Sequence, residues 1–165
     1  MDFKNAFKTL QKDQTYITWK KQYPAAYLVT FFTDINEQLA LGIWRIGFYD
    51  EKSDKIATFA VDAQISYEPL AEAFKKPGPL HELKHKKVKI SAKEARDSVL
   101  ALQREKYAQH LVHKGFLILQ EVEKAPVWNV TLLTRTFAAL NVKVSAATGN
   151  IIEHQLMTFF DMKAK

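Results

Sequence analysis

The sequence predicts an α+β fold built from two tandem α-β-β-β units, with helices packed on antiparallel sheet. Two observations predict it. The same i, i+4, i+7 apolar spacing occurs twice, in Phe3, Phe7 and Leu10 and again in Ala95, Val99 and Leu102. Each helix-like stretch is followed by an apolar run and then by a Trp-led alternation, which starts at Trp44 in one half and at Trp128 in the other. A fixed order of supersecondary units is typical of an internal repeat.

In the first half, we expect helices over residues 2–12 and 15–22. The first helix turns Phe3, Ala6, Phe7 and Leu10 inward, and Pro24 stops the second. Aromatic and β-branched residues predict a strand over 26–33, and alternation predicts strands over 41–49 and 55–63. Residues 68–76 are expected to form a short helix that Pro77-Gly78-Pro79 breaks.

In the second half, Ser91-x-x-Glu94 is typical of a capping box and predicts a helix that runs to about His110. Strands are expected near 115–123, 127–135, 138–146 and 150–160, with one buried and one wetter face. Gly149 suits a tight turn because it accepts positive φ. We predict an N-terminal unit over 1–89 that ends in a basic linker and a C-terminal unit over 90–165, which can pack together as one compact domain.

The composition of the chain excludes some kinds of site and some classes of protein. The chain has 165 residues and no cysteine, which excludes disulfides, thiolate metal sites and thiol nucleophiles. No stretch approaches the ~20 apolar residues of a membrane span. The first residues lack a basic region followed by an apolar core, so we expect a cytoplasmic protein, or an exported one if a signal peptide has been removed. A net charge of +6 permits nucleic-acid binding without requiring it.

Two short patterns resemble the PepSY domain family. They are Ile90-Ser91-x-x-Glu94-Ala95 and Val144-Ser145-Ala146-Ala147-Thr148-Gly149-Asn150-Ile151. The resemblance covers about residues 88–156, and Ser145 departs from the Asp usual in the family; the first half looks like a more diverged copy. It implies a cystatin-like shape, with a helix across an antiparallel sheet, and a role in binding peptides or restraining peptidases. It implies no catalytic residues.

One motif suggests an enzyme. His81-Glu82-Leu83-Lys84-His85 matches H-E-x-x-H, which on a helix would place two zinc-binding histidines on one face with Glu82 as general base. A third ligand would come from Glu105, His110 or His113. The cation at Lys84 and the shortness of the expected helix oppose this chemistry. We therefore expect a solvated, partly helical linker that holds no metal, and keep a small zinc-dependent peptidase as the alternative.

Rings and cations interleave in Tyr16, Trp19, Lys20, Lys21 and Tyr23, and a basic run covers 84–89. Such a mix can stack and neutralise single-stranded nucleic acid. The opposing interpretation, which we favour, packs the rings in the core and leaves the lysines in water. The rings also suit a peptide-binding or homodimer surface.

Taken together, the patterns predict a non-enzymatic module without a cofactor that binds a peptide or protein through an exposed sheet face or edge strand. Trp44 and Trp128 occupy corresponding places in the two halves and are our candidate ligand contacts, although a core position suits them better. Nucleic-acid binding is the second alternative.

Overall fold

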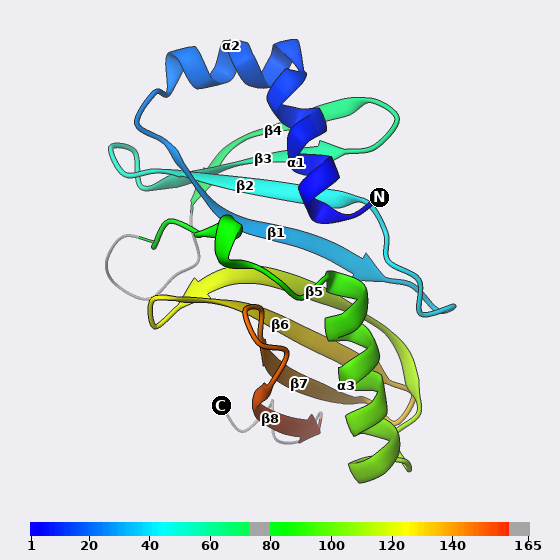
Figure 1. Ribbon diagram of the computed structural model, residues 1–165. Helices are drawn as coiled ribbons and strands as arrows, with labels where there is room; N and C mark the ends of the chain where they lie inside the picture. Colours follow the sequence, from blue (N-terminus) through cyan, green and yellow to red (C-terminus); the bar gives the residue numbers. More distant parts are fainter. Residues whose placement is uncertain (73–79, 159–165) are drawn as a thin grey trace.

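The computed structural model describes residues 1–72 and 80–158 (Figure 1). The first half contains α1 (Phe3–Lys12), α2 (Gln14–Gln22), β1 (Tyr27–Ile35), β2 (Trp44–Asp50), β3 (Lys55–Val61) and β4 (Ile65–Glu72). A short 3-10 helix, η1 (His85–Lys87), leads into the second half. That half contains α3 (Ala92–Lys106), β5 (Val112–Val122), β6 (Ala125–Thr134), β7 (Ala138–Ser145) and β8 (Ile151–Thr158).

All eight strands belong to one antiparallel sheet in the order β4-β3-β2-β1-β5-β6-β7-β8. The centre of the sheet is the pairing of β1 with β5, which runs from Thr30↔Gln120 to Ile35↔Gly115. The prediction of tandem α-β-β-β units with helices packed on antiparallel sheet is therefore wrong. A single open sheet crosses the expected boundary near residue 90, and each half supplies four strands to it.

The fourth strand of the first half is where a helix was expected over 68–76. Residues Ile65–Glu72 instead form β4 and pair with β3, for example Phe59↔Tyr67. The ring of Tyr67 lies 5.1 Å from that of Phe59, so tertiary packing overrides the local helical pattern. Pro69 is tolerated because β4 is an edge strand. The rest of the expected helix, 73–76, lies outside the described residues.

The three expected helices at 2–12, 15–22 and after Ser91 are confirmed. Each has a side-chain cap: Asp2 on α1, Asp13 on α2, and Ser91 with Glu94 as a capping box on α3. Helix α3 ends at Lys106, earlier than expected. The Gln103 amide nitrogen donates to the carbonyl oxygens of Tyr107 and His110 at 3.1 and 2.9 Å. These two hydrogen bonds hold the C-cap residue and the turn that follows the helix.

The helices cover one face of the sheet. Rings from α1 and α2 contact the inward side chains of the first half, as in Phe7–Phe31 at 5.7 Å and Trp19–Phe59 at 5.3 Å. Helix α3 buries Ala95 and Val99 and contacts β6 and β7. Figure 1 shows α1 and α3 in front of the same sheet. Among the described residues, no helix packs on the opposite face.

The segment between β4 and α3 is tied to the sheet at two points. Leu83, which is buried, donates its backbone N–H to the Leu28 carbonyl at 2.8 Å. The backbone N–H groups of Lys89 and Ile90 both donate to the Ala146 carbonyl at 2.9 and 3.0 Å. The segment thus occupies the place beside β1 where the β1–β5 pairing stops, and it carries the chain to the start of α3.

Candidate functional site

The face of the sheet that bears no helix is the best candidate for a functional surface, and we call it the uncovered face. Its side chains alternate with those of the core and are partly or fully exposed. In the middle of the sheet they are Thr30, Phe32, Asp34, Arg45, Phe116, Ile118, Asn129, Thr131, Asn141 and Lys143. Rings, aliphatic groups and paired polar groups therefore share one accessible surface.

Two phenylalanines mark the centre of the uncovered face, on either side of the β1–β5 junction. The rings of Phe32 and Phe116 stack with centroids 5.8 Å apart. The Arg45 guanidinium lies 5.8 Å from the Phe32 centroid and pairs with the Asp34 carboxylate at 3.1 Å. This ion pair holds the guanidinium beside the ring, so the surface combines partly exposed aromatic area with one paired cation and anion.

A polar row adjoins these rings on β6 and β7. The Asn141 amide nitrogen donates to Asn129 Oδ1 at 2.7 Å and to Thr131 Oγ1 at 2.9 Å. Farther out, Lys143 forms an ion pair with Glu153 of β8. These side chains satisfy one another's hydrogen bonds and charges. The polar side of the face therefore carries little unpaired charge.

Elsewhere on the uncovered face, Ile118 borders a hollow of about 210 Å³. The hollow is lined by Val29, Thr30, Ile56, Leu80, His81, Ile118, Gln120 and Glu121. The Thr30 hydroxyl is buried and has no hydrogen-bond partner among the described residues. The hollow thus offers a mostly apolar floor, which is typical of a small binding site, while the hydroxyl of Thr30 stays buried.

Tyr27 fixes the rim of the hollow. Its hydroxyl lies 2.6 Å from the Leu80 carbonyl oxygen and 2.8 Å from Glu51 Oε1 and donates its proton to one of them. Burial, followed by the Glu51 carboxylate, raises the pKa of Tyr27 well above its ordinary value. The phenol therefore stays neutral at any pH near neutrality and remains a donor at the rim, shared between Glu51 and the Leu80 carbonyl.

The zinc alternative required a helix that the structure does not contain. His81 and Glu82 are exposed and lie in irregular backbone, and His85 opens the three-residue helix η1. The His85 ring packs edge-on against Phe7 at 5.1 Å. Within residues 1–72 and 80–158, no three His, Asp or Glu side chains are grouped to hold a metal ion.

The two candidate tryptophans lie in the core, where their ring centroids are 6.2 Å apart. Trp44 is 1% exposed and donates its indole N–H to the Met1 carbonyl, while Trp128 is 0% exposed and donates to the Ile90 carbonyl. This is the arrangement expected of core residues. A ligand would reach either ring only after the core opened.

The interleaved rings and lysines near α2 are also separated by the fold. Tyr16 and Trp19 are buried, and the Lys20 ammonium donates to the backbone carbonyls of Pro24 and Ala26. This region therefore presents neither of these two rings for base stacking. Within the described part of the chain, no helix is long and apolar enough to cross a membrane.

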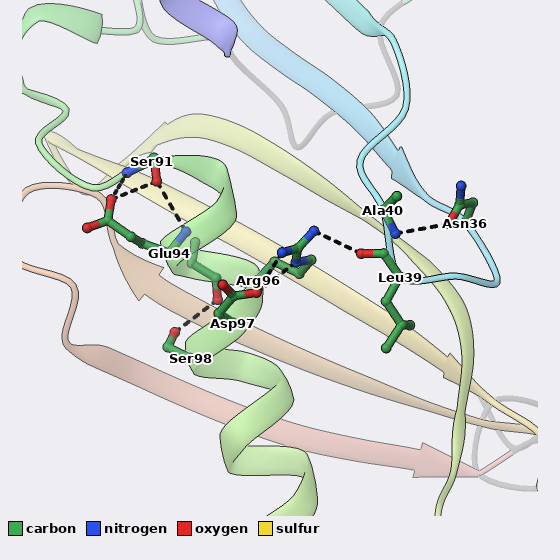
Figure 2. A network of polar contacts seen from close by, with 9 residues as sticks. Asn36, Leu39, Ala40, Ser91, Glu94, Arg96, Asp97 and Ser98 are labelled. Carbon is green, nitrogen blue, oxygen red and sulfur yellow. Dashed lines mark hydrogen bonds and ion pairs between the residues drawn. The ribbon is translucent and has the colours of Figure 1, made fainter. Parts of the chain in front are cut away.

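A polar network ties the two halves together near one end of β1 (Figure 2). Arg96 of α3 donates to the Leu39 carbonyl at 2.9 Å, and the Arg96 guanidinium also pairs with Asp97. Asn36 holds the same loop by accepting from the Ala40 backbone N–H at 2.9 Å. The network fixes the loop between β1 and β2, and with it the strands that carry Phe32 and Arg45.

Comparison with known proteins gives one structural likeness. No protein-family model matches the chain, and no curated protein matches it. The crystal structure of a "putative lipoprotein" from Clostridium difficile 630 superposes with a TM-score of 0.54 at 11% identity and covers 90% of this chain and 97% of that one. A likeness at this identity shows the shared fold alone.

Proposed function

We propose that this protein is a non-enzymatic binding module that holds a peptide segment of a partner protein on its uncovered face. The observation that carries the proposal is the hollow beside Ile118, which continues the stacked pair Phe32–Phe116. In this arrangement an apolar anchor side chain of the partner fills the hollow and its neighbours lie across the rings. Buried aromatic and aliphatic anchors of this kind supply most of the affinity in protein interfaces.

Three features support a peptide rather than a small charged molecule. The stacked rings offer apolar area, and Arg45 and Asp34 neutralise each other, so the centre of the face carries no net charge. The buried Thr30 hydroxyl has no hydrogen-bond partner among the described residues, and rotation of this side chain toward the hollow would let a peptide N–H or carbonyl supply one. The resemblance to PepSY domains, whose inferred role is to bind peptides or restrain peptidases, agrees with this class of ligand.

The test is selection of a random-peptide phage library on the folded protein, followed by affinity measurements on the synthesised binders. Ile118→Trp fills the hollow with a residue that β-strands accept, so it should weaken the selected peptides by at least about tenfold. Gln155→Trp places the same ring on the same face of the edge strand β8 and is the matched control.

The proposal fails if no peptide is selected above background, or if the selected peptides bind Ile118→Trp as tightly as the Gln155→Trp control. Circular dichroism and thermal unfolding of both variants must show the native fold, so that a loss of affinity reports on the hollow. A cytoplasmic site of action stays a prediction, and the description of the structural neighbour favours export as the alternative.

A further inference from the structure

Six exposed lysines gather on the helix-covered side of the molecule, where α1 meets the segment that contains η1. We call this group the lysine patch; its members are Lys4, Lys8, Lys84, Lys86, Lys87 and Lys89. Two contacts bring the elements together. The Lys4 ammonium donates to the Val88 carbonyl at 3.1 Å, and the Phe7 ring packs against His85 at 5.1 Å.

The lysine patch accounts for the net charge of the chain. Without its six members, the 24 lysines and arginines fall to 18 and equal the 18 acidic residues. Among the described residues, no carboxylate lies within ion-pair distance of any of the six ammonium groups. The neighbouring acids include Asp2, Glu82 and Glu121. Asp2 accepts from the backbone N–H of Lys4 and Glu121 from that of Lys84, rather than from the lysine side chains.

Placing like charges together raises the free energy of the folded protein. At His85, burial and then the charge of Lys86 lower the pKa and Lys4 adds to this, while the Leu83 backbone and Glu82 act in the opposite direction. Unpaired charges that cost stability are expected where a function requires them. A surface of negative charge would remove this repulsion, so the patch is suited to a partner that is polyanionic.

We propose that the lysine patch docks the protein on the anionic surface of a lipid membrane. Each lysine close to such a surface contributes about 1 kcal/mol, or roughly a fivefold gain in partitioning. The lysine ammonium is a flexible point charge suited to a diffuse field, whereas nucleic-acid recognition favours arginine forks and stacking rings. The patch contains no arginine. The rings of Phe7 on α1 and of Tyr16 and Trp19 on α2 are buried.

This docking is independent of the peptide site. Both α1 and η1 lie on the side of the sheet that carries the helices, and the uncovered face lies on the other side. A membrane bound at the lysine patch therefore leaves the stacked rings of Phe32 and Phe116 accessible. The two proposals can fail separately, because the tests use different probes and different residues.

The test measures co-sedimentation of the full chain with vesicles of phosphatidylcholine alone or with about a quarter phosphatidylglycerol, at about 50 mM and about 500 mM NaCl. We expect binding only to the anionic vesicles and only at low salt. Lys86→Glu/Lys87→Glu should reduce the partition coefficient at least tenfold. Lys52→Glu/Lys106→Glu makes the same change of net charge away from the patch and should retain most of the binding.

A second measurement reports on the patch itself. NMR titration of His85 should show its pKa rising when anionic vesicles are added, because negative lipid charge offsets the neighbouring lysines. Equal binding to both vesicle types, no binding, or equal losses in the two double variants would overturn the proposal. So would a single-stranded oligonucleotide that binds the patch more tightly than the vesicles and displaces them.

Discussion

The two halves of the sheet are covered in different ways. In the first half, two short helices of 10 and 9 residues meet at Asp13 and cover a core of rings. In the second half, the single 15-residue helix α3 covers a core that is mostly aliphatic. In the described residues, Trp128 is the buried ring of the second half, whereas the first half buries Phe3, Phe7, Tyr16, Trp19, Phe31, Trp44, Phe48, Tyr49 and Phe59.

This difference shows that the volume of the core side chains compensates for the shape of the helices that cover the sheet. Ala92, Ala95 and Val99 are small, so α3 can lie close to β6 and β7 along its length. Two short helices that bend at Asp13 cannot follow a twisted sheet as evenly, and large rings fill the remaining space. Interiors must reach the same packing density whichever solution is used.

The largest expected effect compares one core side chain from each half. Phe59 is 0% exposed and its ring contacts those of Trp19 and Tyr67, so Phe59→Ala should destabilise by about 3–5 kcal/mol. Val142→Ala removes less volume from an aliphatic site that is also 0% exposed and should cost about 2 kcal/mol. Urea unfolding measures both. Equal losses would mean that the ring cluster carries no special share of the stability.

The next prediction compares the two core tryptophans. Trp→Phe removes an indole N–H at either position, but the partner carbonyls differ. Met1 is 73% exposed, so water can replace the donor lost from Trp44, whereas the Ile90 carbonyl lies in the tight connection to α3. Trp128→Phe should therefore cost about 1 kcal/mol more than Trp44→Phe in thermal unfolding. The reverse order would show that the chain start is the more rigid of the two sites.

A smaller effect is expected from the contact that joins the halves. Arg96→Met keeps the aliphatic stem but removes the donor to the Leu39 carbonyl, which should cost about 1.5 kcal/mol. Arg104→Met, at an exposed position of the same helix, is the control and should change little. Hydrogen exchange should show faster opening of the loop between β1 and β2 in Arg96→Met alone; unchanged exchange would mean that Asn36 suffices to hold it.

The smallest effect is a pH dependence at the start of α3. Hydrogen bonds from the Ser91 hydroxyl and backbone N–H hold the pKa of Glu94 below its ordinary value. The stabilisation is therefore present above the unfolded-state pKa and is lost as pH falls through the folded-state pKa. The urea midpoint should drop between about pH 5 and about pH 3, and less so in Glu94→Gln. An identical drop in that variant would assign the pH dependence to other carboxylates.

Local patterns predicted the elements whose stabilising contacts are close in sequence. The apolar spacing that starts at Phe3, the stop at Pro24 and the Ser91–Glu94 capping box sufficed to place all three helices. The structure adds side-chain caps at Asp2 and Asp13, which also act over three residues or fewer. Alternation likewise located seven of the eight strands and showed that Arg45 points away from the core. Segment 65–72 was missed because its conformation depends on β3, which lies outside its own sequence pattern.

The uncovered face could be predicted only in part. Alternation places Phe32 and Phe116 opposite the core residues of their own strands. Their stacking depends on the pairing of β1 with β5, which joins residues 80 to 90 positions apart, from Ile35↔Gly115 to Thr30↔Gln120. The hollow depends on the path of Leu80 and His81 across the end of β1, which no periodicity describes.

By itself, the sequence determined the helices, most of the strands and the excess of lysine at 84–89, because propensity, capping and charge are properties of neighbouring residues. Tertiary structure decided that the two halves share one sheet. It also decided that Trp44 and Trp128 are enclosed, that His81, Glu82 and His85 are not on one helix face, and that Lys4 and Lys8 join the basic run. These outcomes depend on backbone pairing and burial between distant segments, which favour one arrangement only when the whole chain is folded.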